Sequence, residues 1–388
     1  MIDWIIVSFA IIQSFNLLNK IILKKESLQL NIKKISILGL GLIGGSIAKA
    51  LKNSALDLEI SAYDKNEVLE NAFSGNVIDK KLESIDESIN SDLIFLCLPV
   101  NVSLKTFEEL IPKLKQGTII TDVCGVKYPF KKFWDESNSK GIYIGGHPMA
   151  GKEKSGYKNS DPLLLENAVY ILTDDLSKNE ELKDFRKIIE ALGSKILHVP
   201  AKQHDLIAAS VSHLPQLLSV ALVNTAALKT ENYNFLDLAA GGFRDMTRIA
   251  SSDFDIWEPV LEKNKNEILI AVEKFQYELE RIKSNLKNDN LPEIKKSFND
   301  ARKSRDEIPQ NTKGFLSPLH DIFVFVSDKP GVLSKITTEL YNNNINIKDI
   351  ELLKIREGAG GTFRLSFESG ADAETANKIL TSLGYRIK

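Results

Sequence analysis

The chain has 388 residues, with 50 Lys plus Arg against 52 Asp plus Glu and a formal net charge of −2. At about 100–200 residues per domain, this length predicts two to four domains, each able to bury a core. The near-neutral charge argues against a nucleic-acid partner, and 43% hydrophobic residues exclude a wholly disordered chain. Two distant cysteines, Cys97 and Cys124, match no disulfide scaffold or zinc module and indicate a reducing cytoplasm.

Residues 1–32 are expected to form an apolar N-terminal extension. Residues 4–23 are long enough to just span a bilayer, but polar residues such as Gln13, Asn16 and Lys20 interrupt the run. No basic segment precedes it and no small-residue cleavage site follows, so a cleaved signal peptide is not expected. A loosely packed extension is the favoured interpretation, and membrane contact through an anchor is the alternative.

Residues 33–200 alternate short apolar runs with helix-like stretches. This alternation predicts an α/β fold, a Rossmann-type doubly wound parallel sheet with helices on both faces. The strands are expected within residues 33–41, 58–64, 91–99, 117–123, 141–146, 168–173 and 194–200.

Residues 201–305 carry apolar residues at three- and four-residue spacing with little strand signal, which predicts an all-helical domain. Residues 203–228 are apolar nearly all round, which indicates burial against something large, such as a second subunit. Residues 306–318 are polar, contain proline and glycine, and are typical of a linker. Residues 319–388 follow a βαββα order with a further short strand, which predicts a small α+β domain of the ferredoxin-like type.

A glycine-rich turn, GLGLIG, lies between the first expected strand and the first helix. Gly39 permits the tight turn, Gly41 lets the backbone approach a pyrophosphate, and Gly44 lets the helix pack closely. The helix N-terminus offers unpaired N–H groups to phosphates. Asp64 ends the second strand, where it can bind a ribose 2′-hydroxyl and repel a 2′-phosphate, so we predict NAD as the cofactor. The predicted cofactor-binding residues are Gly39, Gly41, Leu42, Ile43, Gly44, Asp64, Pro99 and Asp122.

The segment GGHPMAGKEKSGY places His147 at the carboxyl end of an expected strand. Ligands of doubly wound sheets bind outside these strand ends. A histidine there is a candidate general base near neutral pH. None of the five histidines clusters with acids at metal-ligand spacing, so no metal site is predicted.

Three further polar clusters have both a functional and a purely structural interpretation. TDVCGVK, residues 121–127, is either part of the site or a plain strand-to-helix turn. His213 and Gln216 of SHLPQ either contact substrate or form a satisfied polar pair in the core. Arg248, in GGFRDMTRIASSD, either clamps a carboxylate with two parallel hydrogen bonds or belongs to a solvated ion-pair patch.

These motifs occur in the order and spacing of the prephenate/arogenate dehydrogenase family of tyrosine biosynthesis, which residues 33–388 resemble. The resemblance implies NAD-dependent oxidative decarboxylation of prephenate to 4-hydroxyphenylpyruvate by a cytoplasmic homodimer. It also implies that His147 binds the ring hydroxyl and is catalytic, and that Arg248 holds a substrate carboxylate. The expected substrate-binding residues are Arg248, His213, Gln216, Asp245 and His204.

Two positions depart from the pattern of that family. Gly125 stands where many relatives have a serine that contacts the histidine, and Gln216 stands where many have a second histidine. Gln216 carries no charge, so an arogenate dehydrogenase that makes tyrosine directly is an alternative. Another NAD-dependent dehydrogenase, such as a 3-hydroxyacid enzyme, is disfavoured because those enzymes usually rely on a lysine. A non-catalytic NAD and amino-acid sensor has the loss of the serine as its only support.

The C-terminal segments SDKPGVLSKI and NNNINIKDI resemble an ACT domain. In that family such a turn, paired across domains, binds an amino acid, which implies feedback inhibition by tyrosine. A structural dimerisation domain without a ligand is the alternative. The predicted effector-binding residues are Asp328, Pro330, Gly331, Val332, Leu333, Asn344 and Ile345.

Overall fold

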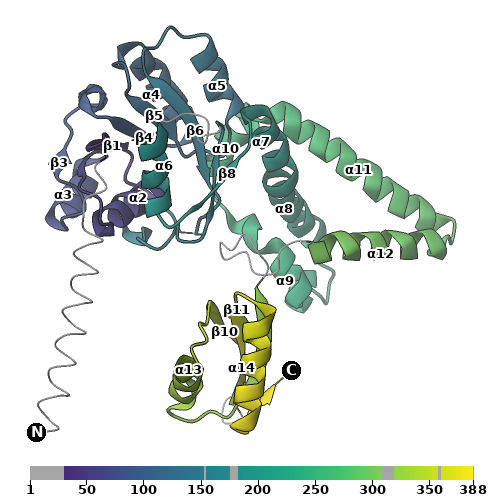
Figure 1. Ribbon diagram of the computed structural model, residues 1–388. Helices are drawn as coiled ribbons and strands as arrows, with labels where there is room; N and C mark the ends of the chain where they lie inside the picture. The colour runs from purple at the N-terminus through teal and green to yellow at the C-terminus, as the bar shows by residue number, and fades with distance from the viewer. Residues whose placement is uncertain (1–29, 153, 175–181, 308–318, 357–359, 388) are drawn as a thin grey trace, which may run out of the picture. The chain divides into compact units, whose positions relative to one another are not determined.

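The computed structural model describes residues 30–152, 154–174, 182–307, 319–356 and 360–387 (Figure 1). The chain divides into two compact units between Asp289 and Asn290. Almost all of the expected N-terminal extension and of the expected linker lies outside the described residues. Leu30 and Ile32, at the end of that extension, are buried in the core of the first unit.

An eight-stranded sheet organises the first unit, in the order β3-β2-β1-β4-β5-β6-β7-β8. The strands from β3 to β6 are parallel, with β1 paired to both β2 and β4. The strand order therefore reverses at β1 and β4, which opens a crevice at their carboxyl ends. The strands are β1 (Lys34–Leu38), β2 (Glu59–Tyr63), β3 (Lys80–Lys81), β4 (Leu93–Leu96), β5 (Ile119–Asp122), β6 (Ile142–Pro148), β7 (Val169–Leu172) and β8 (Lys195–His198).

The predicted Rossmann-type sheet is confirmed, with two differences. β7 runs antiparallel to β6, whereas the sequence predicted a wholly parallel sheet. A parallel return needs a crossover connection, usually a helix, and the described residues between these strands form only the short 3₁₀ turn η3 (Tyr157–Asn159). β3 was not predicted, because two lysines carry no apolar pattern.

Strand alternation divides the core of the first unit into two layers. In β4, Leu93 and Phe95 face one layer while Ile94 and Leu96 face the other. The first layer is covered by α2 (Leu42–Asn53), α3 (Asn66–Ser74) and α6 (Lys183–Ala191). The second is covered by α4 (Val100–Leu110), α5 (Tyr128–Asp135) and part of α10 (Phe254–Lys263), with the 3₁₀ turns η1 (Ile85–Asn90) and η2 (Ile111–Lys113) flanking α4.

The region after the sheet is helical, as predicted (Figure 1). α7 (Ala201–Ala208) continues through a π-helical turn, η6 (Ala209–His213), into α8 (Leu214–Ala226). Pro215 at the start of α8 has no N–H to donate, which interrupts the α-helical hydrogen-bond ladder at this point. The remaining elements are η7 (Phe235–Leu238), α9 (Gly241–Thr247), η8 (Arg248–Ser251), α10 and α11 (Lys265–Lys287).

The C-terminal unit begins with α12 (Leu291–Glu307) and contains a four-stranded antiparallel sheet in the order β10-β11-β9-β12. α13 (Val332–Asn342) and α14 (Gly370–Ser382) pack on this sheet around one core, which contains Val324, Ile336 and Leu380. The predicted βαββα order with a final strand is confirmed. The elements are β9 (His320–Val326), α13 (Val332–Asn342), β10 (Asp349–Arg356), β11 (Gly360–Phe367), α14 (Gly370–Ser382) and β12 (Arg386–Ile387).

An aromatic cluster anchors α4 and α5 to the sheet and provides a test of the second core layer. Phe107 is fully buried, with ring centroids 5.5 Å from Phe130 and 4.8 Å from Tyr143. We expect Phe107→Ala to lower the free energy of unfolding by about 3–5 kcal/mol, through lost burial and a residual cavity. Val102→Ala on the exposed side of the same helix is the control and should change it by less than about 0.5 kcal/mol.

Unfolding in urea, monitored by tryptophan fluorescence, measures the free energy of unfolding. The ring centroids of Trp134 and Phe107 are 6.4 Å apart, so Trp134 reports on this cluster. Equal transition midpoints for the two variants would contradict the assignment of Phe107 to the core.

Candidate active site

The glycine-rich turn has the geometry that a pyrophosphate site requires. Gly39 has a φ of +98°, and a side chain there would meet the carbonyl oxygen of Cys97 at 2.7 Å. A Cβ on Gly44 would lie 1.9 Å from the Gly39 oxygen, so α2 can pack this closely only with glycine. Around Gly41, by contrast, no atom of the described residues lies within 4 Å of the place a Cβ would take, apart from Gly41 itself and its two chain neighbours. The N-terminus of α2, which includes Leu42 and Ile43, is therefore open at Gly41 for a phosphate to approach.

Asp64 lies beside this turn at the end of β2. Its Oδ2 accepts a hydrogen bond from the Leu40 N–H at 2.6 Å, and its Oδ1 accepts one from the Lys65 N–H at 2.6 Å. The half-buried carboxylate is thus held against the turn, and each oxygen keeps a lone pair for a ribose hydroxyl. Pro99 lies exposed at the start of α4, at the carboxyl end of β4 and hence on the same edge of the sheet. These residues fit NAD.

A buried ion pair underlies the turn after β5. Asp122 and Lys127 are both fully buried and form an ion pair with each other. Asp122 also accepts hydrogen bonds from the Cys124 N–H at 2.9 Å and the Tyr143 hydroxyl at 2.9 Å. Burial, reinforced by Asp122, raises the pKa of Tyr143 well above its usual value and that of Cys124 to about 12. Both oxygens of Asp122, a predicted cofactor ligand, are thus engaged within the protein, Oδ1 by the turn that carries Gly125 and Oδ2 by Tyr143 on β6.

His147 lies near the carboxyl end of β6, and its ring faces this loop. Its Cε1 and Nε2 each lie 3.9 Å from the place a Gly125 Cβ would occupy. Its Nδ1 lies 2.8 Å from Nε2 of His204. Burial is the main cause that lowers the pKa of His147 well below its usual value. The nearby His204, Lys127 and His213 lower this pKa further. The imidazole is therefore neutral near pH 7, which is the form that a general base needs.

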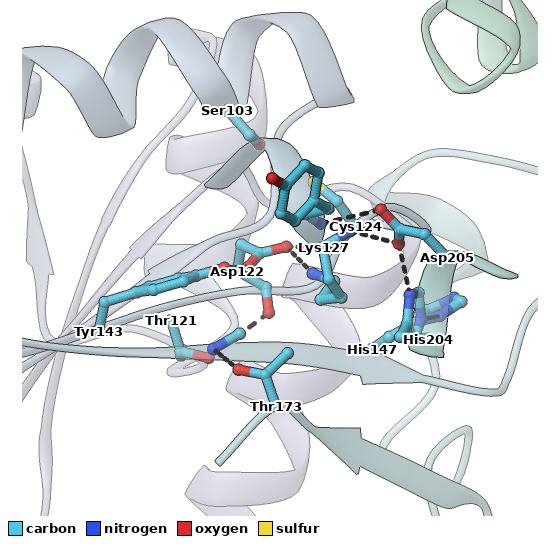
Figure 2. A network of polar contacts seen from close by, with 12 residues as sticks. Ser103, Thr121, Asp122, Cys124, Lys127, Tyr143, His147, Thr173, His204 and Asp205 are labelled. Atoms are coloured by element: carbon cyan, nitrogen blue, oxygen red, sulfur yellow. Dashed lines mark hydrogen bonds and ion pairs between the residues drawn. The ribbon is translucent and has the colours of Figure 1, made fainter. Parts of the chain in front are cut away.

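His204 lies behind His147, at the start of α7 (Figure 2). It is 1% exposed, and its Nδ1 lies 2.8 Å from Oδ1 of Asp205. Asp205 in turn accepts hydrogen bonds from the Lys127 N–H at 2.7 Å and the Tyr128 N–H at 2.8 Å. Both ring nitrogens of His204, a predicted substrate ligand, thus have partners within the protein.

The π-helical turn brings His213 and Gln216 to the interior. His213 Nδ1 lies 3.2 Å from Nδ2 of Asn264, which also donates to the Asp205 carbonyl oxygen at 2.8 Å. Burial lowers the pKa of His213 to about 4, so the ring is neutral near pH 7. Gln216 Nε2 donates to the Ile249 carbonyl oxygen at 3.0 Å, next to Arg248. Gln216 thereby ties α8 to the segment that carries the predicted carboxylate clamp.

Arg248 and Asp245 lie on η8 and α9, and both are exposed. The structure therefore places Arg248 on an accessible surface next to the Gln216 contact, as a ligand for a charged substrate requires. Among the described residues, no group of three or more His, Cys, Asp or Glu side chains is placed to hold a metal ion.

The C-terminal unit has its own candidate ligand site, a cavity of about 220 Å³ at the turn between β9 and α13. Gly331 caps α13 with a φ of +82°, which leaves the helix N-terminus facing this turn without a side chain. Of the predicted effector residues, Asp328, Gly331, Val332 and Leu333 line the cavity, and Pro330 lies within the same turn. Asn344 and Ile345 do not line it, since Ile345 is buried in the core.

The sequence reading did not assign roles to Asp205, Asn264 and Lys127. Asp205 follows His204 directly, so the His-Asp pair was available as a signal in the printed sequence. Asn264 lies in a helical stretch far along the chain, and nothing in the local pattern marks it as a partner of α7. Its role follows from the packing of α11 against η6 and α7.

A Rossmann-type sheet, an open glycine-rich turn and a neutral histidine at the strand ends define an NAD-dependent dehydrogenase. Comparison with known families narrows the class. Residues 47–198 match the nucleotide-binding domain of prephenate dehydrogenase, residues 200–300 its dimerization domain, and residues 320–384 the ACT domain. The chain belongs to the prephenate dehydrogenase family.

Individual relatives agree with this assignment. The chain is 35% identical to prephenate dehydrogenase of Lactococcus lactis, over 90% of this chain and 97% of that protein. It is 32% identical to prephenate dehydrogenase of Bacillus subtilis, over 89% and 95% of the two chains. A crystal structure of prephenate dehydrogenase from A. aeolicus, in complex with hydroxyphenyl propionate and NAD+, is 30% identical and has a TM-score of 0.65, over 72% and 99% of the two chains.

The open space at Gly41 provides a test of the cofactor site. Gly41→Ala should fold normally, because its Cβ meets no protein atom within 4 Å and its φ is −70°. The added methyl group should obstruct the pyrophosphate and raise the Kd for NAD at least about tenfold, roughly 1.4 kcal/mol. Isothermal titration calorimetry with NAD measures the effect, and thermal unfolding provides the control. Unchanged NAD affinity would place the cofactor elsewhere.

Proposed function

We propose that this chain catalyses the NAD-dependent oxidative decarboxylation of prephenate to 4-hydroxyphenylpyruvate. The observation that carries the proposal is the placement of His147, which is neutral and points its ring toward the turn at Gly125, on the cofactor edge of the sheet. The family assignment supplies the substrate class, and the glycine-rich turn with Asp64 fits the cofactor.

His147 has a defined task in this reaction. Nε2 accepts the proton of the ring hydroxyl while the carbon that bears the hydroxyl gives up its hydrogen as hydride. Bound NAD supplies the hydride acceptor. The carbon–carbon bond to the ring carboxylate then breaks, carbon dioxide leaves, and the bonding electrons make the ring aromatic with a negative charge on the ring oxygen. The proton taken up by His147 returns to this oxygen and gives the hydroxyl group of the product. Arg248 neutralises a substrate carboxylate, and Gln216 positions the backbone next to it.

A homodimer is supported by the surface of the helical region. Residues Ala201–Ala226 are apolar enough to cross a membrane by length and composition, with a mean hydropathy of 1.7. Their buried side, however, carries His204, Asp205 and His213 in polar contacts with the site. Apolar side chains such as Val211 and Val220 are exposed on the same helix. A second copy of the chain, in the cytoplasm, is the partner that we propose for this surface.

We also propose that the cavity beside α13 binds tyrosine as a feedback inhibitor. The ACT domain match and the location of the cavity at the predicted turn support an amino-acid effector. The lining combines Asp328, which suits an α-amino group, with the apolar residues Leu333, Leu352 and Phe363, which suit an aromatic ring.

Replacement of the base tests the catalytic proposal. His147→Asn should lower kcat with prephenate by about 10²–10⁴ and leave the Kd for NAD unchanged. Stopped-flow absorbance of NAD reduction measures the rate, and calorimetry provides the control. Since burial lowers the pKa of His147, the wild-type rate should stay constant from neutral pH to below pH 6.5 and fall only where the imidazole becomes protonated.

The same assay with arogenate in place of prephenate separates the two substrates. Turnover of arogenate but not of prephenate would show that the chain is an arogenate dehydrogenase, which forms tyrosine directly. If the wild-type chain binds NAD but turns over neither substrate, the enzyme assignment is contradicted and a non-catalytic sensor is favoured.

Asp328 provides the test of the effector site. Asp328→Ala should raise the tyrosine concentration for half-inhibition at least about tenfold, because the α-amino group loses its carboxylate partner, while basal turnover stays unchanged. Glu374→Ala, an exposed acid on α14 outside the cavity, is the matched control. Full inhibition of Asp328→Ala would indicate that tyrosine acts at the catalytic site as a product mimic.

A further inference from the structure

His147, His204 and Asp205 form a continuous hydrogen-bonded chain that runs from the catalytic turn into the protein interior (Figure 2). Both contacts are 2.8 Å long. His204 and Asp205 are 1% and 2% exposed, so the chain is shielded from solvent beyond His147. An arrangement of buried polar groups with every member paired is costly to disturb, and it fixes the orientation of each ring.

The donors and acceptors of this chain can be assigned from its inner end. The backbone N–H groups of Lys127 and Tyr128 can only donate, so Asp205 accepts both of them. A carboxylate that accepts these bonds also accepts from His204, whose Nδ1 therefore carries hydrogen. With a single hydrogen on each ring, Nε2 of His204 is an acceptor and Nδ1 of His147 donates to it. Nε2 of His147 is left with a free lone pair.

That lone pair belongs to one of the two ring atoms that face Gly125, 3.9 Å from the place of its Cβ. The hydrogen-bond chain thus presents the basic nitrogen of His147 to the turn where a substrate hydroxyl is expected. Without Asp205 and His204, either nitrogen of His147 would be free to carry the hydrogen, and the tautomer with Nε2–H cannot act as a base at this position.

We propose that His204 and Asp205 are positioning residues that hold His147 in its basic tautomer and receive its charge during the reaction. The inference rests on the proposed function. When Nε2 of His147 gains the substrate hydroxyl proton, the N–H bond at its Nδ1 breaks and an N–H bond forms at Nε2 of His204. The single positive charge then lies on His204, directly against the carboxylate of Asp205, and His147 is neutral again.

The charges around His147 favour this transfer. His147 faces His204 from α7, Lys127 from the turn after β5, and His213 from η6. Lys127 is cationic and paired with Asp122, so it disfavours a positive charge on His147. His213 is neutral and hydrogen-bonded to Asn264. Asp205 is the anion that meets this chain, and it touches His204 rather than His147. A buried imidazolium without a paired anion is unfavourable.

Asp205 also has a structural task, which the experiment must separate from the proposed one. It caps the N-terminus of α5 through the Lys127 and Tyr128 N–H groups, so any change at Asp205 also affects helix stability. His204 is the better target, because it lies between the cap and the base and bonds to one atom of each.

Two substitutions at His204 separate positioning from proton transfer. In His204→Gln, the amide can donate to Asp205 and accept from His147, but it cannot take a proton. In His204→Leu, both hydrogen bonds are lost. Gln203→Leu, an exposed neighbour on the same helix, is the matched control. We expect kcat with prephenate to fall about tenfold for His204→Gln and about 10²–10³ for His204→Leu, with the Kd for NAD unchanged in all three.

The pH profile of kcat/KM is the readout that a merely structural role would not change. In the wild type, the proton that the two rings take up lies on His204 beside Asp205. In His204→Gln that proton must stay on buried His147, so the acid limb should move to lower pH. The dependence of the rate on the D₂O fraction should be curved in the wild type, where two protons move, and linear in this variant. A reduced rate with an unchanged acid limb and a curved dependence would overturn the proposed transfer.

Nitrogen-15 NMR of the five histidines tests the tautomers in the protein without substrate, and so independently of the proposed function. At neutral pH we expect hydrogen on Nδ1 of both His147 and His204. At low pH we expect hydrogen on both nitrogens of His204 and on Nε2 of His147. Hydrogen on Nε2 of His147 at neutral pH would overturn the proposal. Should the wild type turn over neither substrate, the proposed function fails, while the spectra still decide whether His204 sets the tautomer.

Discussion

Asp205 joins three segments of the first unit that lie far apart in the sequence. Its carboxylate accepts hydrogen bonds from the first N–H groups of α5 and from the ring of His204, and its backbone carbonyl oxygen accepts one from the amide of Asn264 at the start of α11. An unpaired charge at 2% exposure would be strongly unfavourable, so the position of α5 relative to α7 is tied to the pairing of this carboxylate. The orientation of His147 depends on it in turn.

A buried ion pair, Asp122 with Lys127, lies on the other side of the same loop. Figure 2 shows Asp122 and Asp205 on either side of Lys127, whose side chain meets the first carboxylate and whose backbone N–H meets the second. The loop that carries Gly125 is thus held at both ends by groups that cannot leave without exposing a charge to an apolar interior. This rigidity suits a site in which a proton acceptor must be placed to within a fraction of an ångström.

The glycine-rich turn obeys a different constraint, that of space. Gly39 and Gly44 are required because other atoms of the protein occupy the space that a side chain would need. The space next to Gly41, by contrast, is open. The same motif therefore combines two positions that the packing restricts to glycine with one that the packing leaves open. In the C-terminal unit, Gly331 plays a comparable part by leaving the N-terminus of α13 open to a cavity.

The sequence by itself determined the fold class and the cofactor class, and it singled out His147 as the predicted base. Alternating apolar runs indicated the sheet, and GLGLIG and GGHPMAG are local motifs whose chemistry is contained within a few adjacent residues. The direction of β7 was not accessible, because periodicity reports which face of a strand is buried and not which way it runs.

Only the tertiary structure decided what His204, Gln216 and Asp122 contact. Each is a polar residue whose partners lie on other elements, His147 on β6, Ile249 on η8 and Tyr143 on β6. Hydrogen bonds at 2.8–3.0 Å depend on how helices and strands pack, and a one-dimensional pattern carries no such distances. The printed sequence thus names the candidate groups, and the packing determines which other groups of the protein each of them contacts.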